Sequence, residues 1–386
     1  MRKPDRELVA MLAATAVLAV VSCVLRQASG DAQGPWLSDL RVMWFERGLY
    51  VDRFPFSSPV PGQPILEYPA LGALLMWLSA LPAQSYTGFL WLIAIVLGAC
   101  AMGITALLYP IVGRATWFWA AGPPLVWSLL GNYDAVPALL SVAALALLAG
   151  RDRATISHGR LAASAALLGL GGAAKLYPLI LVLPVVAWVL APSLSAGVRR
   201  AGTVIGAAVG TFALVNLPFL IISPDGWLAP YRFQASRPIS IDTLSIWTVF
   251  GAAGSIPQTA VNLAAALATV LGLAGVAVLS WRRGAARRAY ALLPAAAAFL
   301  AVHLVTNKVY SPQYTLWLLP LLLLAGIKTS MVVTYLVLDA LLAGALAVSV
   351  STDGPAMVAG MLTVFTVAAV RLIVTVVLAR QALAST

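Results

Sequence analysis

The chain has 386 residues, of which 61% are hydrophobic and only 10% are charged. An ordinary soluble domain carries about 25% charged residues, so this composition excludes a soluble globular domain. The net charge of +11 would suggest nucleic-acid binding in a soluble protein, but here the basic residues lie in short segments between apolar runs. That distribution is typical of the cytoplasmic loops of a membrane protein. We therefore predict an all-α, polytopic transmembrane helix bundle with no nucleic-acid partner.

Apolar runs recur from end to end, many of them near the length of about 20 residues that one bilayer span requires. They cover residues 8–25, 68–82, 88–110, 115–130, 134–150, 161–174, 176–191, 201–222, 246–281, 289–305, 314–327, 329–350 and 355–379. The first run follows a basic segment, and with so many later runs we expect it to be an uncleaved signal anchor. Cys23 and Cys100 both lie inside apolar runs, so the sequence offers neither a disulfide framework nor a metal-ligand spacing.

The basic clusters predict the topology. They are Arg2/Lys3/Arg6, Arg151/Arg153/Arg160, Arg199/Arg200, Arg282/Arg283/Arg287/Arg288, Lys328 and Arg380. From Arg151 onward they alternate with the runs, which places both termini in the cytoplasm of a multi-pass cell-membrane protein. An odd number of runs precedes Arg151, so either one of them is not a full crossing or one is not a separate run. The run 68–82 is the weakest, because 15 helical residues reach only about 22 Å. We expect about 12 crossings.

Two predicted external segments are long, 26–67 and 223–245, within what we interpret as a single domain over residues 1–386. The first segment holds Asp31, Asp39, Glu46, Asp52 and Glu67, and the second holds Asp225 and Asp242. A loop that concentrates carboxylates either uses some of them or only needs polar residues in contact with water. Both interpretations stay open for any single carboxylate.

Asp39 follows the first apolar run closely, so it is expected near the outer membrane surface. A carboxylate in that place can act as a general base. Alternatively, Ser38-Asp39 before an apolar stretch is a good helix start, and Asp39 then only caps a helix. Gly48 and a series of prolines break any long helix in this loop, which predicts short helices folded over the bundle.

Several short motifs occur in a fixed order along the chain. They are Asp39-Leu40-x-Val42, Gly48-x-Tyr50, Tyr68-Pro69-x-Leu71, Gly131-Asn132-Tyr133-Asp134, Lys175-x-x-Pro178, Arg237-Pro238, Asn307-Lys308, and Gln313-Tyr314-x-x-Trp317-x-x-Pro320. This ordered set resembles the GT-C glycosyltransferases, most closely the actinobacterial polyprenyl-phosphate-mannose-dependent α-mannosyltransferases of glycosyltransferase family 87. The sequence departs from that pattern at Met43, where an aromatic is usual, and at Ala70, where a second proline is usual.

The resemblance implies an inverting transfer of a sugar, with mannose expected and arabinose left open, from a polyprenyl-phosphate donor. The acceptor would be a lipid-linked or cell-envelope glycan, such as a lipoglycan, on the external face. Asp39 would be the catalytic base, and cations would bind the phosphate leaving group. The candidates are Lys175, Arg232, Arg237, Lys308 and His303. The alternatives are snorkelling to the interface for Lys175, a simple loop cation for Lys308 and a buried core histidine for His303.

Tyr68, Trp44, Asn132, Asp134 and Gln313 are candidate sugar or acceptor ligands. Aromatic residues at run ends are otherwise interface anchors, and Asp134 is otherwise a helix cap. The resemblance implies no metal and no cofactor, because the leaving group carries one phosphate. We expect Asp39 and the helix start at Tyr68-Pro69 to flank one cavity, near which at least two of the candidate cations meet.

Two other classes of function remain open. A polytopic transporter or lipid flippase fits the number of runs and the intramembrane Asp339, which no motif explains. A non-catalytic partner of another glycosyltransferase is the third interpretation. The concentration of carboxylates in one early external loop favours the enzyme.

Overall fold

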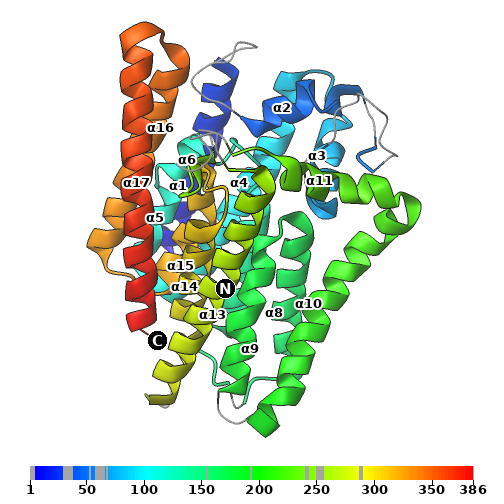
Figure 1. The fold of residues 1–386 in the computed structure, drawn as a ribbon, viewed down its shortest axis with the longest axis vertical. Helices are drawn as coiled ribbons and strands as arrows, with labels where there is room; N and C mark the ends of the chain where they lie inside the picture. Colours follow the sequence, from blue (N-terminus) through cyan, green and yellow to red (C-terminus); the bar gives the residue numbers. More distant parts are fainter. Residues whose placement is uncertain are drawn as a thin grey trace.

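The structure, a computed structural model, describes residues 5–28, 38–51, 54–56, 66, 68–153, 155–191, 194–239, 243–248, 256–286 and 290–385. The elements in these ranges are helices, and no strand occurs among them (Figure 1). The first half contains α1 (Arg6–Ala28), α2 (Asp39–Phe45), η1 (Leu49–Val51), α3 (Ala70–Ala80), α4 (Tyr86–Val112), η2 (Gly113–Thr116), α5 (Trp117–Ala120), α6 (Pro124–Trp127), α7 (Ala135–Leu148) and α8 (His158–Ala174). The second half contains η3 (Tyr177–Leu181), α9 (Val182–Leu190), α10 (Leu194–Ile222), α11 (Pro224–Ser236), α13 (Gln258–Ala286), α14 (Leu292–Thr306), η5 (Pro312–Tyr314), α15 (Thr315–Leu324), α16 (Thr329–Ser351) and α17 (Gly354–Ala384).

Six helical segments of the described chain are long and apolar enough to span a membrane. They are Arg6–Ala28, Tyr86–Ala120, Gly197–Ile222, Gln258–Ala286, Thr329–Ser351 and Gly354–Ala384. Other apolar helices are shorter, such as α7, whose 14 residues reach about 21 Å. The structure therefore confirms an all-helical membrane protein, while the number of about 12 crossings stays a prediction.

Helices α1 and α4 run antiparallel. The Tyr109 hydroxyl, near the end of α4, donates a hydrogen bond to the carboxylate of Asp5 beside the start of α1. At the opposite end, the Trp44 ring of α2 stacks on Phe89 in the first turn of α4, with 5.1 Å between ring centroids. The chain thus returns through α4 to the end of the bundle where it began. We call the other end, which carries α2, the α2 end.

Helix α3 begins and ends at the α2 end. The hydroxyl of Tyr68, two residues before it, donates to Asn132 at 2.6 Å and lies 3.4 Å from Asp39, the first residue of α2. Tyr86, six residues after it, lies 6.5 Å from the Trp44 ring. The run 68–82 is therefore not a full crossing, which accounts for the odd number of runs before Arg151. The run 115–130 is broken as well, because Pro123 and Pro124 separate α5 from α6.

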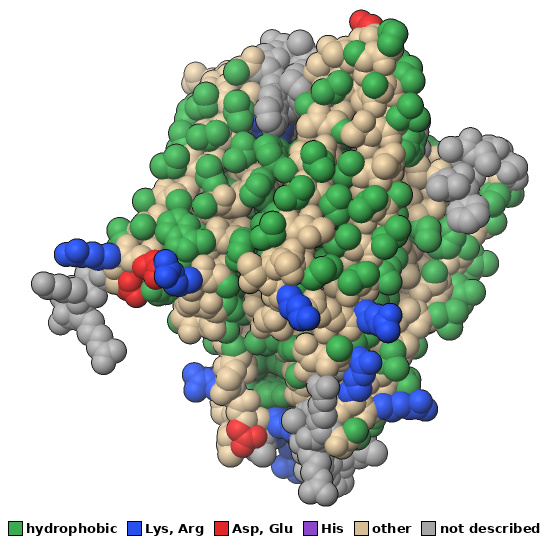
Figure 2. Space-filling view, turned by 90° about the vertical axis from the view of Figure 1, so that its left-hand side faces the viewer, with side chains coloured by type: hydrophobic (Ala, Val, Ile, Leu, Met, Phe, Trp, Pro, Cys, Tyr) green, Lys and Arg blue, Asp and Glu red, His purple; other side chains and the backbone are tan. Residues whose placement is uncertain are grey.

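Basic residues gather at the end opposite α2. The Arg200 guanidinium donates to the carbonyl of Arg153, and His158 Nδ1 lies 2.8 Å from Thr203 Oγ1, so the start of α8 lies beside the first turns of α10. Figure 1 shows α2, α3 and α11 at the upper end and the far ends of α9, α10 and α13 at the lower end. Figure 2 shows Lys and Arg side chains towards the lower part of one face, below a broad hydrophobic surface.

Some of the predicted features lie outside the described residues. These are Asp31, Asp52, Glu67 and Asp242 among the acidic residues, and Arg2, Lys3, Arg287 and Arg288 among the basic ones.

Candidate active site

The start of α2 is held against the turn between α6 and α7. The Ser38 hydroxyl donates to the Leu130 carbonyl at 2.9 Å, and the Asp39 backbone N–H donates to the Gly131 carbonyl at 2.8 Å. Ser38 occupies the N-cap position of α2, and its side chain makes no capping hydrogen bond. The interpretation of Asp39 as a helix cap is therefore wrong, because its carboxylate is used elsewhere.

The Asp39 carboxylate is held by two side chains. Asn132 Nδ2 donates to Asp39 Oδ2 at 2.7 Å, and the Tyr68 hydroxyl lies 3.4 Å from the same oxygen. The Tyr68 hydroxyl also donates to Asn132 Oδ1 at 2.6 Å, and this fixes which way the amide faces. Burial raises the pKa of Asp39, against the lowering effect of Lys175 and Arg237. A carboxylate oriented in this way, with an increased proton affinity, is suited to accept a proton.

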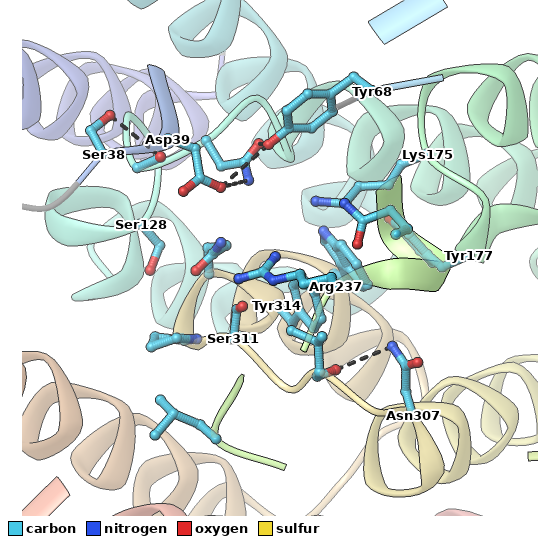
Figure 3. A pocket seen from close by; sticks show the side chains of 18 of the residues that line it. Ser38, Asp39, Tyr68, Ser128, Lys175, Tyr177, Arg237, Asn307, Ser311 and Tyr314 are labelled. Atoms are coloured by element: carbon cyan, nitrogen blue, oxygen red, sulfur yellow. Dashed lines mark hydrogen bonds between the residues drawn. The ribbon is translucent and has the colours of Figure 1, made fainter. Parts of the chain in front are cut away.

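Asp39 faces a cavity of about 650 Å³ at the α2 end. The candidate residues that line it are Asp39, Tyr68, Asn132, Lys175, Arg237, His303, Lys308 and Gln313. Figure 3 shows Asp39 on one side of the cavity and Lys175 facing it from the other, next to Tyr68, with Arg237 below them; the Lys175 ammonium lies 5.5 Å from the Tyr68 ring. The volume is that of a small-molecule site, which typically measures about 300–1,000 Å³.

Lys175 joins the cavity to a buried carboxylate. Its ammonium lies 2.5 Å from Asp134 Oδ1, and the Asp134 side chain is fully buried. Asp134 stands at the start of α7 but makes no capping hydrogen bond, so the expected capping role is wrong. The Lys175 side chain keeps 17% exposure, and its ammonium also lies 5.2 Å from the Tyr314 ring and 4.9 Å from the Trp317 ring. Lys175 therefore presents part of its charge to the cavity.

The aromatic wall beside Lys175 is a stack of three rings. Trp317 stacks on Tyr177 at 4.1 Å and on Tyr314 at 3.7 Å between ring centroids. All three residues line the cavity. A cation above aromatic faces is stabilised by the ring quadrupole, which favours an ordered Lys175 side chain.

Lys308 also holds protein groups together. Its ammonium donates to the Gln234 carbonyl at 2.5 Å and to Asn262 Oδ1 at 3.0 Å, and so links the end of α11 to α13. Burial, with the neighbouring Arg237, lowers the pKa of Lys308. His303 has a buried Nδ1 with no hydrogen-bond partner in the described structure, although its side chain lines the cavity.

Three candidates, Arg232, Trp44 and Asp134, are not among the residues that line the cavity. Arg232 lies on the exposed face of α11, where it pairs with Asp225 at 2.9 Å. Trp44, on α2, is buried and its ring stacks on Phe89 of α4. Asp134 likewise reaches the cavity only through Lys175.

Arg26 is a cavity residue that the sequence analysis missed. It lines the cavity, is buried and donates to the Trp127 carbonyl. Its one signal in the sequence is a charge at the end of an apolar run, which topology alone explains.

The described residues contain no group of three or more His, Cys, Asp or Glu side chains that could hold a metal ion. The acid–base and cationic groups that line the cavity are instead single side chains from different helices and helix ends. The arrangement offers one carboxylate opposite several cations, which suits proton removal next to a developing negative charge.

Comparison with known proteins agrees with this chemistry. The family model described as glycosyltransferase family 87 matches residues 66–306, which is more than half of the chain. Tyr68, Asn132, Lys175 and Arg237 lie within the match, whereas Asp39 precedes it. No curated protein matches the chain. The chain therefore belongs to glycosyltransferase family 87.

Proposed function

We propose that this glycosyltransferase moves a sugar, mannose in the first instance, with inversion from a polyprenyl-phosphate donor to a glycan or glycolipid acceptor. The observation that carries the proposal is the half-buried Asp39 carboxylate, oriented by Asn132 and facing Lys175 and Arg237 across one cavity. The proposal also uses the resemblance of the ordered motifs to polyprenyl-phosphate-mannose-dependent enzymes.

In the proposed reaction, the acceptor oxygen attacks the anomeric carbon as its proton passes to Asp39. The bond between that carbon and the phosphate oxygen breaks, and polyprenyl phosphate leaves with the bonding electrons. A β-linked donor therefore gives an α-linked product. The phosphate gains negative charge as the bond breaks, so cations fixed in advance stabilise the transition state more than the ground state.

Lys175 and Arg237 are the proposed phosphate ligands. Both line the cavity, and both lower the pKa of Asp39 through their charge, which places them within electrostatic reach of that carboxylate. Arginine suits two-point contacts to a phosphate, and lysine acts as a point charge. Lys308 and His303 also line the cavity and remain in the proposal. The exposed pairing of Arg232 with Asp225 argues against a direct contact by Arg232.

We further propose that the α2 end faces the outside of the cell and that the chain crosses the membrane about 12 times. The basic turns gather at the opposite end, where cytoplasmic loops are expected. An even number of passes with both termini inside agrees with α3 returning to the end from which it starts.

A transfer assay tests this function. Purified enzyme in lipid would receive a polyprenyl-phosphate sugar labelled in the sugar, together with candidate glycolipid acceptors. The proposal predicts label transfer with inverted anomeric configuration and release of polyprenyl phosphate. A transporter or flippase instead predicts that the labelled donor changes leaflet without any glycosidic product, and that result would replace the enzyme interpretation.

A further inference from the structure

A buried ion pair joins α16 to α17. The Arg371 guanidinium lies 3.5 Å from Asp339 Oδ1, and the two side chains are 1% and 0% exposed. The Arg371 guanidinium also lies 4.2 Å from the Tyr310 ring. Ionisable residues inside a membrane bundle are costly, and they usually mark function. No motif in the sequence explains this pair, and both residues follow the segment matched by the family model.

Arg371 reaches from α17 to the short turn before α15. Its guanidinium donates to the Pro312 carbonyl at 3.1 Å and lies 3.5 Å from the Ser311 carbonyl. It also donates to the Thr315 hydroxyl at 2.9 Å, and that hydroxyl donates in turn to Asp339 Oδ1 at 2.5 Å. Asp339 therefore balances the charge of Arg371 and orders the Thr315 hydroxyl, while Arg371 holds the backbone of the turn.

This turn forms one wall of the cavity. Ser311, Pro312, Gln313 and Tyr314 all line it, and Tyr314 belongs to the aromatic stack beside Lys175. Helix α16 connects the pair to a second wall of the cavity. Ala343 and Leu346 follow Asp339 at helical spacings of four and seven residues, so the three side chains lie on one face of α16. Both of these residues line the cavity as well. One ion pair thus contacts the polar turn and lies on the same helix face as an apolar wall.

We propose that Asp339 and Arg371 are positioning residues that fix the turn at residues 311–314 against α16. They thereby set the shape of the cavity beside Lys175, where the donor phosphate is proposed to bind. The pair does not line the cavity and takes no part in proton transfer. Its effect on catalysis rests on the function proposed above. Its effect on the order of the turn does not.

The first test measures the turn without substrate, by amide hydrogen exchange in purified protein. Arg371→Lys keeps a positive charge beside Asp339 but loses the rigid planar fork of the guanidinium, whose two terminal nitrogens contact the Ser311 and Pro312 carbonyls separately. Exchange over residues 311–317 should become about tenfold faster or more, given the usual strength of hydrogen bonds to charged groups. Arg380→Lys, on the exposed face of the same helix, should leave exchange unchanged. Unchanged exchange in Arg371→Lys would overturn the proposal.

The second test separates positioning from folding. The double variant Asp339→Leu/Arg371→Met removes both charges together and leaves no unpaired buried charge, so the bundle should still fold. With a polyprenyl-phosphate sugar as donor, both this variant and Arg371→Lys should raise the donor KM by about tenfold or more, with kcat and its pH profile much less changed. A folded double variant with wild-type KM and wild-type exchange would contradict the inference. Absence of transfer in the wild type would instead refute the proposed function and leave the exchange result standing.

Discussion

Replacing Lys175 by methionine, with a suitable control, separates its structural pairing with Asp134 from its proposed contact with the donor phosphate. In the native structure its ammonium lies 2.5 Å from the fully buried carboxylate of Asp134. Lys175→Met would leave that carboxylate without its counter-charge, and the other oxygen, Oδ2, already has no hydrogen-bond partner in the described structure. Removing one member of a buried ion pair typically costs about 3–5 kcal/mol of folding free energy. We therefore expect a marked fall in the apparent melting temperature of the purified protein.

The double variant Lys175→Met/Asp134→Asn provides the control for folding. It removes both charges, so most of the lost stability should return. If Lys175 binds the donor phosphate, transfer should stay reduced by about tenfold or more, the equivalent of at least about 1.4 kcal/mol. The assays are thermal unfolding in detergent and steady-state transfer with a polyprenyl-phosphate sugar. A stable double variant with near-native donor KM would show that Lys175 is only structural, and would leave Arg237 as the principal phosphate ligand.

Three further variants or conditions test the site. Asn132→Ala removes the 2.7 Å hydrogen bond to Asp39, and since hydrogen bonds to charged groups contribute about 1.5–3 kcal/mol, kcat should fall by roughly 10- to 150-fold with little change in donor KM. Burial raises the pKa of Asp39, and the carboxylate form is the base, so wild-type kcat/KM should fall as the pH drops through a midpoint above the usual aspartate pKa of about 3.9. In Asn132→Ala this midpoint should move to still higher pH, because the hydrogen bond that stabilises the carboxylate is lost. Lys308→Met should lower thermal stability, because it removes the donor to Gln234 and Asn262; an unchanged melting temperature with a raised donor KM would assign Lys308 to the phosphate instead.

The short helices and the motifs of the first long external segment could be predicted from the sequence, because both are encoded by residues that are neighbours along the chain. Asp39 and Tyr68 lie on either side of a proline-rich loop, and each belongs to a short motif. The prolines predict a broken chain, and α2 and η1 are indeed short. The resemblance made Asn132 a candidate sugar or acceptor ligand, but its hydrogen bond to Asp39 could not be predicted, since no local pattern brings together two residues from different external turns.

Other contacts could not be predicted, because they depend on how distant helices pack. Asp134 has the position of a helix cap in the sequence, yet its carboxylate pairs with Lys175 on another segment. In the sequence, Asp339 is the one charged residue of α16 and Arg371 is one of two in α17, and neither helix shows a pattern that pairs them. Only the crossing of α16 and α17 brings their charges together.

Span counting was partly predictable. The odd number of runs and the short length of 68–82 single out this run as the weakest candidate for a crossing, and α3 does start and end at the α2 end. Whether an apolar helix crosses the membrane depends on where its ends are fixed. The ends of α3 are fixed by contacts of Tyr68 with Asn132 and of Tyr86 with Trp44. A hydropathy average over one run carries no information about such contacts.

The most direct test of the central claim is single-turnover transfer by Asp39→Asn. Asparagine keeps the shape and can still accept a hydrogen bond, but it cannot take the proton of the acceptor hydroxyl. Removing a positioned general base should slow transfer by about 10²- to 10⁴-fold, with donor binding and thermal stability close to the wild type. Glu46→Gln, an exposed carboxylate just past the other end of α2, is the matched control and should retain full activity. If Asp39→Asn keeps more than about a tenth of the wild-type rate, a loss below ~1.4 kcal/mol, Asp39 is not the base.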